Sequence, residues 1–415
     1  MLTSVSRRLV PPSQTATTSA SPKTKIKTAK ISDSDFRASI LEAHQIKIVY
    51  RGEFVDSFYQ HLGLAELGMA QDRATRDEQY KQILTLEIWR TSNHNSDLNL
   101  RKRYDNMVFS SSNEAEFAAC ALEKLVIHEL QDQDQLMSTD RRLAPVRMLQ
   151  LFHKPSLPPG QEAAWDIWLA PPQFETVDKK YEWDVHPDCA YYVALEAFPG
   201  SVRSELTAYL SVVEERACAP YLTIEFKKND ETIETAENQV ATASALALYN
   251  RWRLKDMALR AKTTRREDTT RKQKQNPGGP DNADQQLQEG KGGSYWSEVD
   301  KRQIRHYGFT FLRSQWTSWK IEPKEYDKWT GCTMTAAKRG NCRRLDDIQH
   351  LQSILNDIHG WGMLVHAEAC QADIATIISA VAKAEGVSWN SSDNYDQEYI
   401  NEGPQFKGRK QPNAA

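Results

Sequence analysis

Hydrophobic positions recur at helical spacing through the first third of the chain. Residues 34–44 open with alternating Ser and Asp, which is typical of a helix start, and residues 113–131 carry apolar side chains three or four positions apart. Prolines at positions 155, 158 and 159 interrupt this pattern. The pattern therefore predicts mostly helices between residues 34 and 130, and a change of structure near residue 155.

Shorter runs with alternating apolar and polar residues follow the prolines. They predict three strands, at residues 165–169, 189–196 and 221–228. The longest helical pattern of the chain comes next, at residues 232–260. It lies between these strands and the aromatic region that begins near residue 305.

The last ordered region combines both kinds of pattern. Residues 306–312 and 315–321 are rich in aromatic and β-branched residues and predict a hairpin that turns at Arg313 and Ser314. Residues 344–358 and 371–384 return to helical spacing. We therefore predict an α/β fold, with a mixed β-sheet flanked by helices and a helical N-terminal extension.

Polar segments divide the chain into regions. Residues 1–33 carry several bases and only one acid, at the end of the segment, and predict a disordered basic arm. Residues 34–160 form the helical N-terminal region, and residues 161–388 form the α/β domain. Within that domain, residues 261–294 are rich in Gln, Asn, Gly and charge and predict a disordered insertion. Residues 389–415 predict a flexible tail.

Composition excludes several protein classes. Hydrophobic residues make up 40% of the chain and no run approaches the ~18 apolar residues of a membrane span, so we expect no membrane partner. Six widely spaced cysteines without a secretory leader indicate reduced thiols and an intracellular protein. The net charge of −3 means that any nucleic-acid interface must be local, and the sequence leaves the oligomeric state open.

The strand predicted at residues 221–228 carries charge on one face only. Its period of two places Leu222, Ile224 and Phe226 on one side, and Glu225 and Lys227 on the other. The first side has the composition of a core. The second presents an acid and a base next to each other.

A second acid stands at the start of a neighbouring strand. Asp188 comes immediately before the strand predicted at residues 189–196, so pairing of the two strands would bring it close to Glu225. Mg²⁺ prefers hard oxygen ligands, which Asp188, Glu225 and the backbone carbonyl of Phe226 supply. Lys227 would then orient a metal-activated water and stabilise negative charge on a phosphate.

These residues resemble the PD-(D/E)xK nuclease superfamily, which has the restriction-endonuclease-like fold. The match is Pro187-Asp188, then Glu225-Phe226-Lys227, then an amphipathic helix, and it is similar to uncharacterised fungal proteins of that superfamily. It is strongest over residues 181–249 and looser over residues 305–370. The resemblance implies Mg²⁺-dependent hydrolysis of phosphodiester bonds, with Mn²⁺ as a substitute metal and DNA favoured over RNA.

The resemblance also implies further site residues. Superfamily members usually add a polar residue from the helix after the lysine strand, and Gln239 or Glu237 takes that position here. They also use an acid from the first core helix, for which Glu116 and Glu123 are both candidates. Asp184 is an alternative to the acid of the Pro-Asp pair.

Two other clusters admit a functional and a structural interpretation. Residues 251–274 hold ten bases against three acids and could bind phosphate or direct nuclear import, or could form a solvated helix end. They favour a nuclear localisation, while the basic N-terminal arm leaves a mitochondrial one open. Cys332, Cys342, His366 and Cys370 are zinc-ligand types, but their spacing also suits buried thiols and a packed histidine.

Activity is a separate question from fold. The first hypothesis is an endo- or exonuclease that uses Asp188, Glu225, Lys227 and Gln239. The alternative is a catalytically inactive relative that uses the same sheet as a nucleic-acid or protein binding module.

Overall fold

The computed structural model describes the central part of the chain and omits some segments within it. The described residues are 27–50, 70–79 except 73 and 77, 93–126, 146–149, 169–227 except 184, 196–197, 204 and 214–216, 233–274, and 294–384. Predictions for the strand at 165–169, for residues 275–293 and for the tail at 389–415 lie outside this part.

One eight-stranded mixed sheet organises the molecule. Its strands are β2 (Ile46–Val49), β3 (Val146–Leu149), β5 (Cys189–Ala194), β6 (Val212–Val213), β7 (Ala217–Lys227), β8 (His306–Leu312), β9 (Gln315–Pro323) and β10 (Cys332–Asn341). They follow the order β2-β10-β9-β8-β7-β5-β3, with β6 beside β7. The pairs β2 with β10 and β7 with β8 are parallel, and the other pairs are antiparallel. A separate two-stranded sheet joins β1 (Lys27–Thr28) to β4 (Lys179–Lys180).

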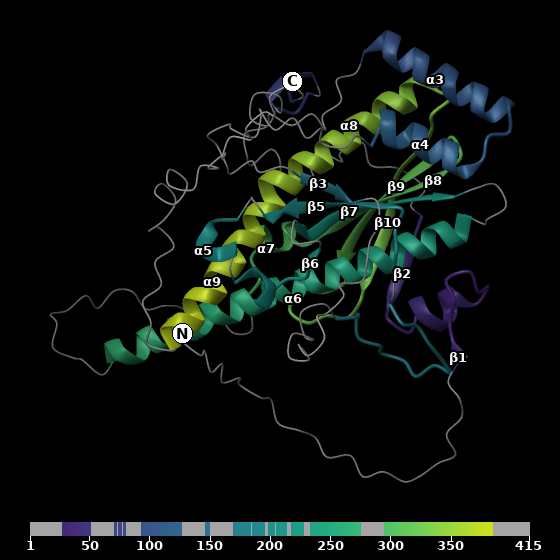
Figure 1. Cartoon of the computed structure of the whole chain (residues 1–415). Coiled ribbons are helices and arrows are strands. Elements are labelled where there is room, and N and C mark those ends of the chain that lie inside the picture. Colours follow the sequence, from purple (N-terminus) through teal and green to yellow (C-terminus); the bar gives the residue numbers. More distant parts are fainter. Residues whose placement is uncertain are drawn as a thin grey trace, which may run out of the picture.

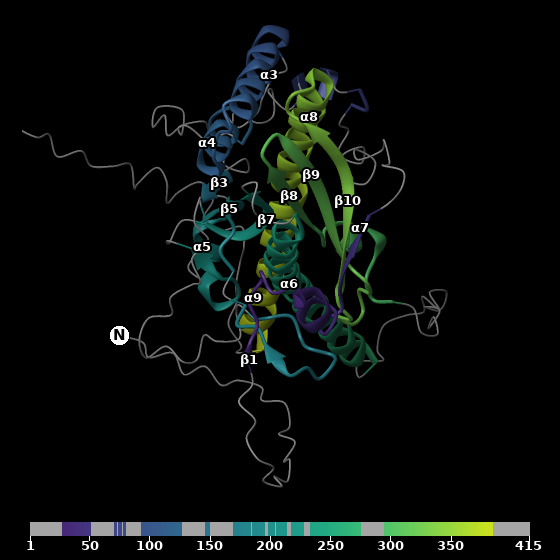
Figure 2. The same cartoon turned by 90° about the vertical axis from the view of Figure 1, so that its right-hand side faces the viewer.

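Helices cover both faces of the large sheet, so the predicted mixed α/β fold flanked by helices is confirmed. The helices are α3 (His94–Phe109), α4 (Glu114–Lys124), α5 (Gly200–Arg203), α6 (Ile233–Lys274), α7 (Glu298–Arg302), α8 (Leu345–Trp361) and α9 (Glu368–Ala384), with π-helical turns η1 (Arg37–Leu41) and η8 (Gly362–Ala367) and the 3₁₀ turn η7 (Leu206–Ala208). Figure 1 shows the strands between α6 and the α8–α9 pair, and Figure 2 shows the same arrangement turned by 90°.

The two faces of β7 belong to different cores. Ile224 and Phe226 pack in one cluster with residues of α4 and α8. The other face lies under α6, whose Val240 and Leu246 pack in a second cluster with Trp319 of β9. All eleven residues of β7 are buried as a result. A third cluster joins the middle of α6 to α9, and the two helices converge there at the lower left of Figure 1.

Several predicted boundaries hold and others are wrong. The hairpin forms at the predicted residues, with Leu312 opposite Gln315. The long helix is wrong in extent: α6 runs for 42 residues to Lys274, so the first part of the predicted disordered insertion is helical. Helix α6 continues because residues 261–274 contain no Gly or Pro and many good helix formers.

The predicted domain division is also wrong at its N-terminal side. Strands β2 and β3 both lie before residue 161, so the supposed helical extension contributes two strands to the sheet. Strand β1 likewise lies within the predicted arm at 1–33.

Beside β2, Gly331 adopts a φ of 102°, and a Cβ there would stand 2.3 Å from the Gln45 backbone oxygen.

The helical segment from Leu345 to Ala384 is long and apolar enough to cross a membrane by length and composition alone. In the fold, Ile348, Leu351 and Ile358 pack in the core against the sheet, while Ile374 and Ile377 pack against α6. Within the fold, α8 and α9 therefore pack as helices of the protein core.

The docking of α6 depends on close approach at one glycine. A Cβ on Gly308 of β8 would stand 2.4 Å from Val240 Cγ1 of α6. We therefore expect Gly308→Ala to lower the free energy of unfolding by about 1–3 kcal/mol, through overpacking. Val240→Ala alone should also destabilise, by loss of buried methyl groups.

The double variant separates this contact from a general effect. In denaturant unfolding, Gly308→Ala combined with Val240→Ala should lose less stability than the sum of the single variants, because the smaller side chain makes room for the new methyl group. If the stability losses of the two single variants simply add, the docking of α6 does not depend on the close contact between Gly308 and Val240.

Candidate active site

Strand pairing brings the two predicted acids together. Cys189 of β5 lies opposite Ile224 of β7, which places Asp188 beside Glu225. The Asp188 backbone N–H donates to Glu225 Oε2 at 3.3 Å, and the Phe226 N–H donates to Asp188 Oδ2 at 2.6 Å. The carboxylates are thus held by the backbone of each other's strand.

Lys227 completes a compact charged group. Its Nζ donates to Glu225 Oε1 at 2.6 Å, because residues two apart on a strand share a face. The exposed fraction of Glu225 is 1% and that of Lys227 is 7%. Two carboxyl groups and one ammonium group therefore lie together in a region from which most water is excluded, and only Asp188 is partly exposed.

This environment changes the protonation of Glu225. Burial and the neighbouring Asp188 charge raise the pKa of Glu225 to about 8, and Lys227 only partly opposes them. A carboxyl group with this pKa retains its proton in much of the protein at neutral pH. A bound cation would compete with that proton.

The donor set suits a hard divalent cation. Once Glu225 loses its proton, Lys227 balances only one of the two carboxylate charges, and a cation would be stabilised by the second. The ligands available from the predicted set are Asp188, Glu225 and the Phe226 carbonyl. No group of three or more His, Cys, Asp or Glu side chains gathers as a metal site within the described residues, so water would complete the coordination, as Mg²⁺ prefers.

The predicted residues on α6 differ in their surroundings. Gln239 is half-buried, and its Oε1 is buried with no hydrogen-bond partner. No hydrogen bond joins it to the acid pair in the described part of the chain. Glu237 is 1% exposed, and its Oε1 also lacks a hydrogen-bond partner. Two unsatisfied oxygen ligands therefore lie in the first turns of the helix that follows β7.

The N-terminal segment holds Glu237 in place, which the sequence did not predict. Arg37 of η1 donates to Glu237 Oε2 at 2.6 Å and to Asn238 Oδ1 at 2.8 Å, and Tyr50 also donates to Glu237 Oε2. The Tyr50 ring meets the edge of Trp319, with centroids 5.7 Å apart. These partners are roughly two hundred positions away in the chain, so no local pattern could reveal them.

The two candidates for the first-helix acid have other partners. Glu116 closes a capping box with Asn113 at the start of α4. Glu123 is exposed and forms an ion pair with Arg103 at 2.9 Å. Both lie on α4, which packs on the Ile224 side of the sheet, away from Glu225. Neither joins the acid pair, and Asp184 lies outside the described residues.

Of the interpretations open for residues 251–274, neither phosphate binding nor a solvated helix end fits two of the bases. Arg251 and Lys255 are buried and form ion pairs with Asp373 of α9, at 2.8 and 3.1 Å. Lys255 also contacts Asp300 of α7 at 2.6 Å. Arg260 is exposed and pairs with Asp256 within the same helix. Two of the ten bases in this stretch therefore join α6 to α9 and α7.

The four candidate zinc ligands do not converge. Cys332 and Cys342 lie at opposite ends of β10, and Cys370 belongs to a third core cluster. Only Cys370 and His366 are neighbours, with Sγ and Nε2 3.8 Å apart. Burial raises the pKa of Cys332 to about 12 and that of Cys370 to about 11. These are buried neutral thiols, in agreement with the structural interpretation.

One family model matches part of the chain. It describes a domain of unknown function, DUF7924, and covers residues 179–270. The matched range runs from β4 through β7 into α6 and contains Asp188, Glu225, Lys227 and Gln239. Comparison with curated proteins and with solved structures finds no match.

The raised pKa of Glu225 has a measurable effect on stability. Since the folded pKa of about 8 exceeds the ordinary value of 4.5, this group's contribution is full below pH 4.5 and is lost as pH rises through 8. Glu225→Gln should remove this loss. The stability of the variant relative to wild type should therefore rise between pH 5 and 8, by up to about 1.4 kcal/mol per pH unit.

Denaturant unfolding of both proteins across this range tests the effect. Other titrating groups cancel in the difference between the two proteins. Glu322→Gln provides a control, because Glu322 forms a similar strand pair with Lys320 at 2.7 Å but is 30% exposed. A stability difference for Glu225→Gln that does not change with pH would contradict the raised pKa.

Proposed function

We propose that this protein is a Mg²⁺-dependent nuclease that hydrolyses phosphodiester bonds of DNA. The observation that carries the proposal is the convergence of Asp188, Glu225 and Lys227 across β5 and β7, with the acid and base of β7 almost completely buried. A buried acid with a raised pKa beside a buried base is typical of a catalytic site.

The surrounding architecture is consistent with this proposal. Strand β7 leads into α6, which covers the face of the sheet that carries Glu225 and Lys227. The chain then returns as β8, which is parallel to β7. The resemblance to the PD-(D/E)xK superfamily includes the first of these steps, from the lysine strand into an amphipathic helix. The DUF7924 match, which carries no assigned function, spans the same residues.

Each residue has a distinct role in the proposed reaction. Asp188 and Glu225, with the Phe226 carbonyl, would hold the metal, and Mg²⁺ bound there would lower the pKa of a water and offset charge on the scissile phosphate. Lys227 would position the attacking water and stabilise the negative charge that develops on the phosphate. Gln239 would provide a further polar contact from α6.

Cleavage assays test this function directly. Labelled single-stranded DNA, duplex DNA and RNA would be incubated with the full-length protein in Mg²⁺, Mn²⁺ or EDTA. We expect metal-dependent cleavage of DNA that falls by about 10²-fold or more in Glu225→Gln and in Lys227→Met. Glu322→Gln should cleave as wild type, because its similar acid–base pair lies on β9, is more exposed and is not part of the proposed site.

The outcomes separate the two hypotheses. Cleavage that persists in Glu225→Gln would assign the activity to another site or another protein. If no protein cleaves any substrate with either metal, while all bind DNA equally, the chain is an inactive binding module with a nuclease-like site. Preferential cleavage of RNA would overturn the choice of substrate.

A further inference from the structure

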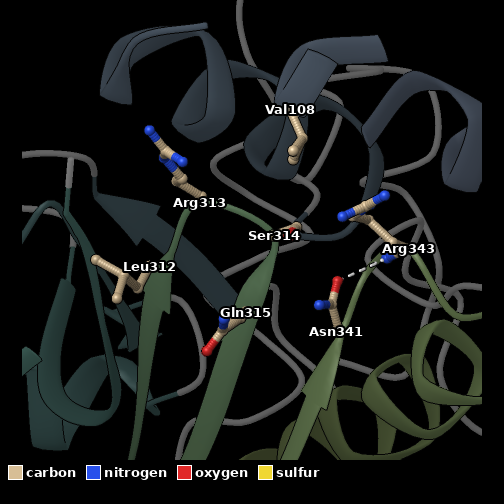
Figure 3. A pocket seen from close by; sticks show the side chains of 7 residues that line it. All are labelled: Val108, Leu312, Arg313, Ser314, Gln315, Asn341 and Arg343. Atoms are coloured by element: carbon tan, nitrogen blue, oxygen red, sulfur yellow. Dashed lines mark hydrogen bonds between the residues drawn. The ribbon is translucent and has the colours of Figure 1, made fainter. Parts of the chain in front are cut away.

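A polar pocket opens at the end of the sheet where the β8–β9 hairpin turns. It has a volume of about 350 Å³ and lies where the β8–β9 hairpin tip, the end of β10 and the end of α3 meet. Figure 3 shows Arg313 and Arg343 on either side of Ser314, below the helix that carries Val108. The remaining lining residues are Leu312, Gln315 and Asn341.

The sheet connects this pocket to the candidate active site. Lys227 lies opposite Leu312, Leu312 opposite Gln315, and Gln315 opposite Asn341. Residues in one such row point to the same face of a sheet. The row that starts at Lys227 therefore reaches the pocket at Leu312, on the adjacent strand, and ends at Asn341, three strands away.

A second row of paired residues, next to the first, also crosses the sheet from the acid pair. It begins at Glu225 and passes through Thr310 and Thr317 to Arg339 on β10. Arg339 is exposed, and its guanidinium lies 4.8 Å from the centre of the Tyr50 ring. The two rows thus lead from the acid pair to Asn341 and Arg339. Thr310 and Thr317 within the second row are buried, and Arg313 and Arg343 lie beside the ends of the rows, at the pocket.

The pocket arginines offer positive charge to a ligand. Arg313 Nε is buried and has no hydrogen-bond partner in the described part of the chain. Arg343 Nε is held at 2.6 Å by Asp105 of α3, which orients the guanidinium and balances one charge. The pocket therefore keeps an excess of positive charge, with one donor left unsatisfied.

The backbone at Arg313 is strained. Its φ is 54°, in the left-handed region that favours Gly or Asn at a two-residue hairpin turn. An arginine has no intrinsic preference for this conformation, which costs free energy. Strain of this kind is expected where a side chain is retained for binding.

Hydrogen bonds hold the walls of the pocket rigid. The Cys342 N–H donates to the Ser314 carbonyl at 2.8 Å and joins the hairpin tip to the end of β10. The Asn341 N–H donates to Asp347 at 2.9 Å, and Asn341 Oδ1 accepts from the Arg343 N–H at 3.0 Å. A preformed pocket loses little entropy on binding.

We infer that Arg313, Arg339 and Arg343 form a track that binds the phosphate backbone of a DNA strand whose scissile phosphate lies at the acid pair. Lys227 and Asn341 are three strand spacings apart, or about 14 Å, which corresponds to about four nucleotides at 3.4 Å per step. The inference rests on the proposed function, but the binding itself requires no catalysis.

DNA binding is tested without cleavage. Fluorescence anisotropy of labelled duplex and single-stranded DNA would be measured in EDTA, with Glu225→Gln as the background, over a range of salt concentrations. We expect Arg313→Asn and Arg343→Ala each to weaken binding roughly three- to tenfold at low salt. Each should lower the slope of log K against log salt by about 0.9 for duplex or 0.7 for single strands.

Arg313→Asn also separates binding from folding. Asn tolerates a positive φ better than Arg, so the Tm of this variant should equal or exceed that of its background while its DNA binding weakens. Loss of binding together with a lower Tm would instead indicate a damaged hairpin and would overturn the proposed role.

Arg260→Ala is the matched control. Arg260 is an exposed arginine that forms an ion pair with an aspartate, as Arg343 does, but it lies on α6 within residues 251–274. We expect it to leave affinity and salt slope unchanged. If Arg260→Ala lowers the salt slope while the pocket variants do not, the DNA lies on α6 and the proposed track is wrong. Stronger binding of RNA than of DNA would also overturn the proposal.

Failure of the proposed function would be visible separately. If wild type does not cleave DNA in Mg²⁺ or Mn²⁺ but the pocket variants still lower the salt slope, the track stands and the nuclease does not. If cleavage occurs and the slopes are unchanged, the nuclease stands and the DNA path lies elsewhere.

Discussion

The complete burial of β7 is the constraint on which the rest of the structure depends. A strand with eleven buried residues needs cover on both faces and pairing along both edges. Strands β5 and β8 occupy the edges, while α6 and the group of α4 and α8 occupy the faces. Because β8 runs parallel to β7, the chain must cross over the sheet between them, and α6 is part of that crossover.

Burial also determines the electrostatics of the candidate site. Glu225 and Lys227 cannot be solvated where β7 places them, so they pair with each other at 2.6 Å. That pair leaves Asp188 with a charge that repels Glu225 and contributes to its raised pKa. Well-packed hydrophobic residues are often as stabilising as a buried ion pair, so the presence of two acids and a base here supports the proposed function better than a purely structural role.

The basic residues of the chain have two different roles. Arg251 and Lys255 join α6 to α9 through Asp373, an arrangement that stabilises the fold and offers little to a ligand. Arg313 and Arg343 lie at the open end of the sheet, beside the row that begins at Lys227. The density of bases in the sequence admitted a phosphate-binding or a structural interpretation of the first group, and the ion pairs support a structural role for Arg251 and Lys255.

Local patterns were sufficient for the parts of the fold with strong periodicity. The strands β5, β7, β8 and β9, the long helix and the acid–base alternation at Glu225 and Lys227 all follow from residues close together in the chain. Strand β10 was missed although Cys332, Met334 and Ala336 alternate with polar neighbours, so its signal was present. Residues 261–274 were misjudged because polar composition is compatible with a solvated helix as well as with disorder.

The remaining features come from contacts between distant segments. The sequence by itself determined the mixed α/β class and which residues could carry chemistry, because side-chain alternation is a local property. Only the tertiary structure decided that β2 joins β10, that Arg37 and Tyr50 hold Glu237, and that Arg251 is buried. Strand register and helix docking depend on the packing of whole elements, and no window of the sequence contains both partners of such a contact.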